Sequence, residues 1–533
     1  MVHEDGDQPN EPHGHPVAFP PRCHPSSRRS SVGERMMRGG LMVCGTTSNS
    51  GKTTLVAGLC RSFSRAGVRV APFKAQNMAL NSAVTRTGHE IGRAQYLQAQ
   101  AAGIEPEVAM NPVLLKPTGE RSSQVVVMGK PVGAMSAVEY HHAKPELFAL
   151  VLDALADLRS RFDVVLVEGA GSPAEINLLA HDIVNLRLAE AAGLPAIVVG
   201  DIDPGGVFAS LYGTVAVLPD ELRDCIGGFV INKLRGDPAL LLDGTDQLAE
   251  LSGIPTFGVV PMLPDLRLDA EDSLALDAPF ESNLDASLDV AVIRLPRISN
   301  FTDIDALALE PDVAVRYVRS ARELGHPDLV VIPGSKATVS DLGWLRSRGL
   351  DRAIAALDER STVIGICGGY QMLGEWIDDD VESGDGRCDG LGHLPVHTRF
   401  DADKVLACRD GQAMGAPVSG YQIHHGRVAL SGDRGEAWLE LDDGEAEGIR
   451  AGRYFGTTLH GVFDQDTFRR SFLAQVAARA GTTFSPGDRT PAVHREQELD
   501  RLADHLEASL DLAALYDLMA TAEPLRTSTP KVD

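Results

Sequence analysis

The stretch "LMVCGTTSNSGKTTLVAGLCR", residues 41–61, decides the fold of the first half of the chain. An apolar strand-like run enters a loop that ends in Gly51-Lys52-Thr53, and a helical stretch follows directly. In this order the backbone N–H groups of the loop cradle phosphates, the lysine reaches the terminal phosphate oxygens, and the threonine hydroxyl ligates Mg²⁺. The first glycine, Gly45, gives the spacing G-x5-G-K-T, one residue longer than the common loop. The sequence therefore predicts a nucleotide site at this turn.

More apolar strands follow, in the segments "RVAPFKAQ", "FDVVLVEGAG", "LPAIVVGDID" and "CIGGFVINKL". Continuous runs of Val, Ile and Leu separated by longer amphipathic runs are typical of a parallel sheet covered by helices on both faces. The predicted fold class is therefore α/β, with a doubly wound domain in the first half. A second set of such segments begins at "DVAVIRLP" and continues through "PDLVVIPGSKAT" and "STVIGICGGY".

Length and composition indicate two domains with flanking segments. The chain has 533 residues, which exceeds what one hydrophobic core usually supports. The predicted divisions are a disordered extension over 1–38, a nucleotide-binding domain over 39–252, a linker over 253–288, a second α/β domain over 289–485 and a helical tail over 486–533.

The composition excludes several classes of protein. The formal net charge of −25 argues against a general nucleic-acid binder, and the apolar runs are too short or too interrupted to span a bilayer. The seven cysteines are an odd number, contain no CxxC pair and follow no secretory signal. We therefore expect a protein of the reducing cytoplasm.

Two polar residues at strand ends extend the predicted nucleotide site. Glu168 ends a buried strand, where ligands bind in parallel sheets, and Mg²⁺ favours one or two carboxylates together with phosphate oxygens. The alternative for Glu168 is a solvated acid at a strand end. Asn232 follows another buried strand, where its amide could read the edge of a purine.

A second candidate site lies in "VIGICGGYQMLGE", residues 363–375. Cys367 stands between small residues at a strand-to-helix turn, the geometry of a nucleophile elbow, and a helix N-terminus lowers a thiol pKa. His460 in "TTLHGVFD" is the leading candidate for its base, with His424 and His425 as competitors. The N–H of Gly368 and the loop at Gly334 or Ser335 are candidates for an oxyanion hole. The alternative for Cys367 is a buried small hydrophobe.

The two sites together suggest a division of labour. A thiol that attacks a carboxamide releases ammonia from glutamine, and a nucleotide site activates a carboxylate that accepts the ammonia.

Nine blocks carry a family resemblance: "GTTSNSGKTTLVAGLCR", "PFKAQNMALNS", "EGAGSPAEINL", "GDIDPGGVFASLYGT", "GFVINKLRGD", "LPRISNFTDIDAL", "PGSKATVSDL", "GICGGYQMLG" and "TTLHGVF". In this order, over about residues 40–480, the chain resembles the cobyric acid synthases, glutamine-dependent amidotransferases of cobalamin biosynthesis. The resemblance implies a P-loop domain similar to dethiobiotin synthetase and a flavodoxin-like class I glutamine amidotransferase domain. It also implies ATP- and Mg²⁺-dependent amidation of the b, d, e and g carboxylates of adenosylcobyrinic acid a,c-diamide, giving adenosylcobyric acid.

The resemblance also implies roles for single residues. Cys367 would be the nucleophile and His460 its base, and Thr53 and Glu168 would hold Mg²⁺. The implied ATP contacts are Gly45, Thr46, Asn49, Gly51, Lys52, Thr53, Thr54 and Asn232. The implied substrate contacts are Lys74, Gln76, Asn77 and Asn81. The expected partners are the corrinoid and L-glutamine, with no nucleic acid and no membrane, and self-association into a homo-oligomer stays open.

The chain departs from the wider amidotransferase pattern at one position. Many class I enzymes carry an acid two residues after the histidine, where this chain has Val462. Either a dyad suffices or an acid such as Asp464 orients the imidazole, so no triad is assigned.

Two rival readings remain at this point. One is a partner-regulated ATPase resembling the MinD and ParA switches, although their extra early lysine is missing from Gly45-Thr46-Thr47. The other is the related synthase that amidates the a and c carboxylates, from which "PFKAQNMALNS" separates this chain.

Overall fold

The computed structural model describes residues 39–118, 122–268, 283, 285–432 and 434–524. The predicted extension over 1–38 and part of the predicted linker lie outside these residues. Among the described helices, none combines the length and the apolar character needed to cross a membrane.

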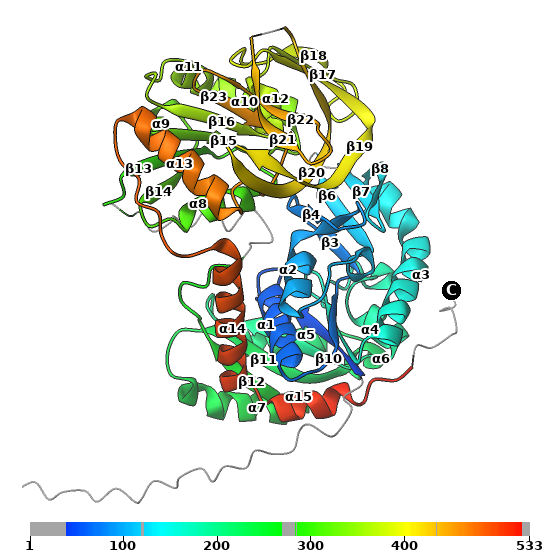
Figure 1. The fold of residues 1–533 in the computed structure, drawn as a ribbon. Helices are drawn as coiled ribbons and strands as arrows, with labels where there is room; N and C mark the ends of the chain where they lie inside the picture. Colours follow the sequence, from blue (N-terminus) through cyan, green and yellow to red (C-terminus); the bar gives the residue numbers. More distant parts are fainter. Residues whose placement is uncertain (1–38, 119–121, 269–282, 284, 433, 525–533) are drawn as a thin grey trace, which may run out of the picture. The chain divides into compact units, whose positions relative to one another are not determined.

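A six-stranded parallel sheet forms the centre of the first α/β domain (Figure 1). The order of its strands is β12-β11-β10-β1-β9-β2. Their bounds are β1 Gly39–Gly45, β2 Val70–Phe73, β9 Val164–Glu168, β10 Ala196–Asp201, β11 Ile226–Leu234 and β12 Thr256–Pro261. The helices of this domain include α1 Lys52–Arg65, α2 Arg93–Ala101, α3 Ala137–Arg161, α4 Leu186–Ala192, α5 Val207–Ala216, α6 Asp220–Arg223 and α7 Leu242–Ser252.

Both faces of this sheet are buried, as the continuous apolar strands predict. Along β1, Met42 and Cys44 pack into one hydrophobic core and Leu41 and Val43 into another. Successive side chains of a strand point to opposite faces, so a strand covered on both sides is apolar at every position. The predicted doubly wound arrangement is confirmed.

The end of the chain completes the core of the first domain. Helices α14 (Pro491–Ser509) and α15 (Leu512–Met519) supply buried leucines to the same core as Leu41 and Val43. Within the predicted tail over 486–533, α14 and α15 are thus part of this core. The predicted linker over 253–288 also differs from the structure, because it begins with the edge strand β12.

Replacing Leu502 with alanine is expected to destabilise the first domain. Leu502 is 2% exposed, and it packs so closely on α1 that a Cβ on Gly58 would lie 2.9 Å from its Cγ. Truncating a buried leucine costs about 2–5 kcal/mol of the free energy of unfolding. Urea unfolding measures this loss. Val493→Ala on the exposed side of α14 is the matched control, with an expected change within about 0.5 kcal/mol. Equal effects of the two variants would contradict the packing described.

A small, mostly antiparallel insertion lies between β2 and α3, where the sequence predicts no sheet. Three of its strands pair antiparallel, and β3 joins them in parallel. The four strands are β3 Gln76–Met78, β6 Val113–Pro117, β7 Ser122–Val127 and β8 Lys130–Ser136, and a separate hairpin consists of β4 Ser82–Val84 and β5 Glu90–Gly92.

The second α/β domain is built on an eleven-stranded sheet. Its parallel part has the order β14-β13-β15-β16-β23, which is the 2-1-3-4-5 order of flavodoxin-like folds and confirms that prediction. These strands are β13 Leu288–Ile293, β14 Val313–Val318, β15 Leu329–Ile332, β16 Thr362–Ile366 and β23 Tyr454–Thr457. An extension, antiparallel except where β17 pairs with β19, adds β17 Trp376–Asp379, β18 Gly386–Asp389, β19 Val396–Ala413, β20 Ala416–Leu430, β21 Glu436–Leu441 and β22 Ala446–Ala451. Helices α8 Asp305–Ala308, α9 Ala321–Leu324, α10 Thr338–Ser347, α11 Leu350–Ala355, α12 Gly368–Leu373 and α13 Asp466–Ala480 belong to this domain.

Both predicted sites follow the carboxyl ends of parallel strands. The phosphate-binding loop follows β1, and Glu168 is the last residue of β9. Cys367 follows β16 directly, and His460 comes shortly after β23. This is where open α/β sheets bind their ligands.

Candidate functional site

The phosphate-binding loop curls around the side chain of Lys52. The Lys52 Nζ donates hydrogen bonds to the carbonyl oxygens of Thr47 (2.8 Å) and Gly171 (3.2 Å). A Cβ on Gly45 would lie 2.1 Å from Ser50 Oγ and 2.9 Å from Lys52 Nζ, so only glycine fits there. Gly51 has φ 92° and is the N-cap residue that precedes α1. The loop therefore has the small residues and the buried cation that a polyphosphate requires.

The Glu168 carboxylate connects three side chains of this site by hydrogen bonds. Its buried carboxylate accepts hydrogen bonds from Thr53 Oγ1 at 2.7 Å, Lys74 Nζ at 2.9 Å and Gln98 Nε2 at 2.7 Å. The predicted pair Thr53 and Glu168 is thus in contact, and Lys74 joins it. A hydroxyl beside a carboxylate is a donor set that suits Mg²⁺ when phosphate and water oxygens complete the shell. Such a site needs no cluster of three His, Cys, Asp or Glu side chains, and the described residues contain none.

The other predicted nucleotide contacts surround the loop. The Thr46 N–H donates to the Val199 carbonyl, the Asn49 carbonyl accepts from Lys233 Nζ, and Thr54 is exposed on the first turn of α1. Asn232 Nδ2 donates to the Ser50 carbonyl at 2.9 Å. In this structure Asn232 therefore supports the loop, and its contact with adenine stays a prediction.

The predicted substrate residues lie on the segment that leads away from Lys74. Gln76 Oε1 accepts a hydrogen bond from Tyr140 at 2.5 Å, and Asn77 Nδ2 donates to Gln95 Oε1 at 3.1 Å. Asn81 is 1% exposed. Gln95 in turn bonds Gln98, so a chain of amides connects Asn77 to the Glu168 carboxylate.

Cys367 occupies the strained turn that the sequence predicts. Its φ of 49° lies in the left-handed region, and it caps the N-terminus of α12. A Cβ on Gly369 would lie 1.9 Å from the Ile332 carbonyl oxygen, so this position must be glycine. Burial raises the pKa of the thiols of Cys44 and Cys60, which suits them to the core and not to catalysis.

His460 is held by an aspartate that the sequence analysis missed. Its Nδ1 lies 2.7 Å from Asp303 Oδ2, and the Gly461 N–H donates to Asp303 Oδ1 at 2.7 Å. Burial alone would lower the pKa of His460, but the Asp303 carboxylate and the Cys367 sulfur outweigh it and raise the pKa to about 10. Asp303 lies in the block "LPRISNFTDIDAL". Its position shortly after a predicted strand is the sequence feature that could have indicated a site residue.

The alternative that Asp464 orients the imidazole is not what the structure shows. Asp464 is exposed, and its N–H bonds the Gly461 carbonyl, whereas Asp303 contacts the ring. The carboxylate comes from the short helix Phe301–Ile304 after β13, a strand that β15 and β16 separate from β23 in the sheet.

Replacing Asp303 with asparagine is expected to slow glutamine hydrolysis roughly 10- to 1000-fold, because the orienting carboxylate of a catalytic histidine is lost. The pKa of His460 should also fall. A histidine whose pKa is raised keeps its charge until the pH passes that pKa, so a lower pKa moves the basic limb of kcat/KM to lower pH. Glutamate formation measured across pH tests both effects. Asp464→Asn is the control, and an unchanged profile in Asp303→Asn would contradict the assignment.

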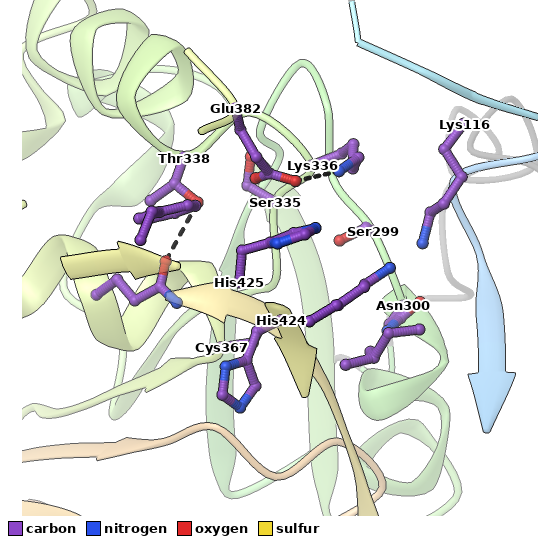
Figure 2. Close-up of a pocket in the computed structure, with 14 residues that line it drawn as sticks. Lys116, Ser299, Asn300, Ser335, Lys336, Thr338, Cys367, Glu382, His424 and His425 are labelled. Carbon is purple, nitrogen blue, oxygen red and sulfur yellow. Dashed lines mark hydrogen bonds and ion pairs between the residues drawn. The ribbon is translucent and has the colours of Figure 1, made fainter. Parts of the chain in front are cut away.

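A pocket opens beside Cys367 (Figure 2). Its lining includes Ser299, Ser335, Thr338, Gln371, Phe400, Ile423, the pair Lys336 and Glu382, and also Lys116, Asn300, Lys404, His424 and His425. Burial lowers the pKa of His424 to about 4, so that ring is neutral at pH 7. Lys116 belongs to β6 of the first domain, and Figure 2 shows it across the pocket from Thr338.

The predicted oxyanion-hole residues lie around this pocket. A Cβ on Gly334 would lie 2.9 Å from His460 Cε1, and a Cβ on Gly368 would lie 2.9 Å from the Ser335 backbone nitrogen. The structure therefore brings Cys367, His460, Gly334 and Gly368 together. The competing histidines are placed otherwise: His424 Nδ1 and His425 Nδ1 contact backbone carbonyls.

Two family models match the chain. Residues 41–275 match the "CobQ/CobB/MinD/ParA nucleotide binding domain", and residues 289–468 match the "CobB/CobQ-like glutamine amidotransferase domain". A cobyric acid synthase of Rhodococcus jostii (strain RHA1) is 54% identical over 502 residues, which cover 92% of this chain and 98% of that protein. The chain belongs to the cobyric acid synthase family. A second member, from Streptomyces coelicolor (strain ATCC BAA-471 / A3(2) / M145), is 53% identical over 499 residues with the same coverage.

Membership in the cobyric acid synthase family decides between the readings that the sequence left open. The protein is an enzyme of the amidoligase class, and the switch ATPases are related to its first domain only. The predicted combination of a P-loop nucleotide-binding domain with a glutamine amidotransferase domain is confirmed.

Proposed function

We propose that this enzyme amidates the b, d, e and g carboxylates of adenosylcobyrinic acid a,c-diamide, with ATP as the activating substrate and glutamine as the nitrogen source. The observation that carries the proposal is the presence of a candidate nucleotide site and a candidate thiol site in one member of the cobyric acid synthase family. One surrounds Lys52, Thr53 and Glu168, and the other surrounds Cys367 and His460. Glutamine and a corrinoid are the substrates.

Glutamine hydrolysis is assigned to Cys367 and His460. The raised pKa of His460 favours a protonated imidazole beside the Cys367 sulfur. The thiolate is the nucleophilic form of a cysteine. The thiolate attacks the carboxamide carbon of glutamine, and the Gly368 N–H, with the Gly334 loop beside it, stabilises the oxyanion. His460 gives its proton to the departing ammonia, leaving a thioester. Water, deprotonated by His460, cleaves the thioester to glutamate and restores the thiol.

The nucleotide site is assigned to the phosphate-binding loop. Lys52 and the loop N–H groups would hold the phosphates of ATP, and Thr53 with Glu168 would hold its Mg²⁺ ion, which neutralises phosphate charge. Transfer of the terminal phosphoryl group to a corrinoid carboxylate gives an acyl phosphate, and ammonia displaces phosphate from it to form the amide. Lys74 lies beside Glu168, where a cation stabilises the transferred group.

The assignment of the substrate is tested by the mass of the product. The enzyme is incubated with adenosylcobyrinic acid a,c-diamide, ATP, Mg²⁺ and glutamine. We expect four successive losses of about one mass unit, because each amide replaces a hydroxyl by an amino group. An unchanged a,c-diamide, together with two amidations of cobyrinic acid, would show that the enzyme is the related a,c-synthase.

A further inference from the structure

Ser82 connects residues 74–81, the segment that carries the predicted substrate contacts, to the site around Cys367 and His460. It follows Asn81 directly, begins β4 and is 1% exposed. Its N–H donates to Asn300 Oδ1 at 3.2 Å, and its carbonyl accepts from the Tyr421 hydroxyl at 3.2 Å. Asn300 and Tyr421 both belong to the second domain, so two hydrogen bonds connect this serine of the first domain to the second domain.

The Ser82 hydroxyl is fixed by a buried charge cluster. It donates to Glu90 at 2.9 Å and accepts from Lys116 Nζ at 2.9 Å. Lys116 and Lys404 both contact the Glu90 carboxylate, at 2.7 Å and 2.6 Å. Burial alone would raise the pKa of Glu90, but the two lysines outweigh it and hold the pKa well below its ordinary value. Because Lys404 lies on β19, one ionised carboxylate binds cations from both domains.

The first connection from Ser82 to His460 runs through Asn300. Asn300 has φ 52° and precedes the short helix Phe301–Ile304, which carries Asp303. The Asp303 N–H donates to the Asn300 carbonyl at 3.3 Å. Asp303 then fixes the imidazole through its 2.7 Å contact with Nδ1. A displacement of Asn300 therefore changes the position of the carboxylate that orients His460.

The second connection runs through Tyr421 on β20. The Tyr421 and His460 backbones exchange two hydrogen bonds, of 3.0 Å and 2.9 Å. Their rings stack with centroids 5.4 Å apart and an interplanar angle of 25°. The ring of Tyr421 thus lies against the candidate base while its hydroxyl binds Ser82.

We propose that Tyr421 and Asn300 are positioning residues for glutamine hydrolysis. Through its hydrogen bonds to these two residues, Ser82 makes the position of the His460 ring depend on whether corrinoid and ATP are bound at residues 74–81. The inference rests on the proposed function. Binding of corrinoid and ATP shifts residues 74–81, Ser82 passes this shift to both partners through the two hydrogen bonds, and glutamine hydrolysis accelerates. Ammonia is thereby released when an activated carboxylate can consume it.

Tyr421→Phe tests this proposal by removing one hydroxyl while keeping the stacked ring. Tyr454→Phe is the matched control, because the Tyr454 hydroxyl bonds Arg453 within the second domain. Asn300→Gly removes the side-chain acceptor of the Ser82 N–H and tolerates the positive φ. Glutamate formation is measured with and without ATP, Mg²⁺ and adenosylcobyrinic acid a,c-diamide. Amidation by free ammonium is measured in parallel.

We expect Tyr421→Phe and Asn300→Gly each to lower the stimulation of glutaminase by acceptor and ATP about two- to tenfold, the loss expected for one hydrogen bond. Amidation by ammonium should stay within about twofold of wild type, because the nucleotide site is intact. Tyr454→Phe should behave as wild type. Wild-type stimulation in both variants, or a wild-type glutaminase that acceptor and ATP do not stimulate, would overturn the proposal. Absence of ammonium-dependent amidation in the wild type would instead refute the proposed function.

Discussion

Replacing Cys367 with alanine is expected to abolish amidation with glutamine and to leave amidation with free ammonium intact. The variant removes the sulfur that attacks the carboxamide, so glutamine-dependent turnover should fall roughly 1000-fold or more. The nucleotide site is formed by other residues, among them Lys52 and Glu168, and keeps its contacts. Product mass with each nitrogen source measures both effects.

Cys388→Ala is the control for this variant. Cys388 lies on β18 in the same domain, and burial raises the pKa of its thiol, so it is expected to be inert. Glutamine-dependent amidation that survives in Cys367→Ala would contradict the assignment of the nucleophile. Loss of ammonium-dependent amidation in that variant would contradict the separation of the two sites.

Replacing Lys52 with alanine is expected to abolish amidation from both nitrogen sources. The Lys52 ammonium is buried inside the loop, and no other lysine donates to the Thr47 and Gly171 carbonyls among the described contacts. Loss of a preorganised cation at a phosphoryl group costs roughly 100-fold or more in rate. Glutamine hydrolysis without acceptor should persist, because Cys367 and His460 are untouched.

Lys130→Ala provides the matched loss of a lysine, since Lys130 is exposed on β8. Phosphate release and corrinoid mass, measured in the same reaction, report the nucleotide site directly. Amidation by Lys52→Ala at the wild-type rate would show that the loop does not hold the activating nucleotide.

The first sheet could be predicted because burial leaves a local signature. Met42, Cys44, Leu41 and Val43 are all apolar since each face of β1 meets its own core. The packing of α14 and α15 left no such signature. The amphipathic pattern of a helix predicts that one face is buried, but it does not predict which element packs against that face. Here the tertiary fold places α1, at Gly58 and its neighbours, against α14.

The candidate sites divide in the same way. The loop at Lys52 and the turn at Cys367 were predicted because their glycine spacing is local and their backbone geometry demands it. Asp303 was missed because it is separated from His460 by 157 positions in the sequence, so no local pattern links the two. The acid expected near the histidine in sequence is supplied by a short helix after β13, and only the tertiary fold brings the two side chains together.

The passage of nitrogen from glutamine to the corrinoid is the central claim of this account. Glutamine labelled with ¹⁵N at the amide is supplied with ATP, Mg²⁺ and adenosylcobyrinic acid a,c-diamide, in the presence of unlabelled ammonium. If Cys367 releases ammonia that the nucleotide site consumes, the new amides carry mostly ¹⁵N. New amides that carry only unlabelled nitrogen, or no new amides at all, would contradict the account.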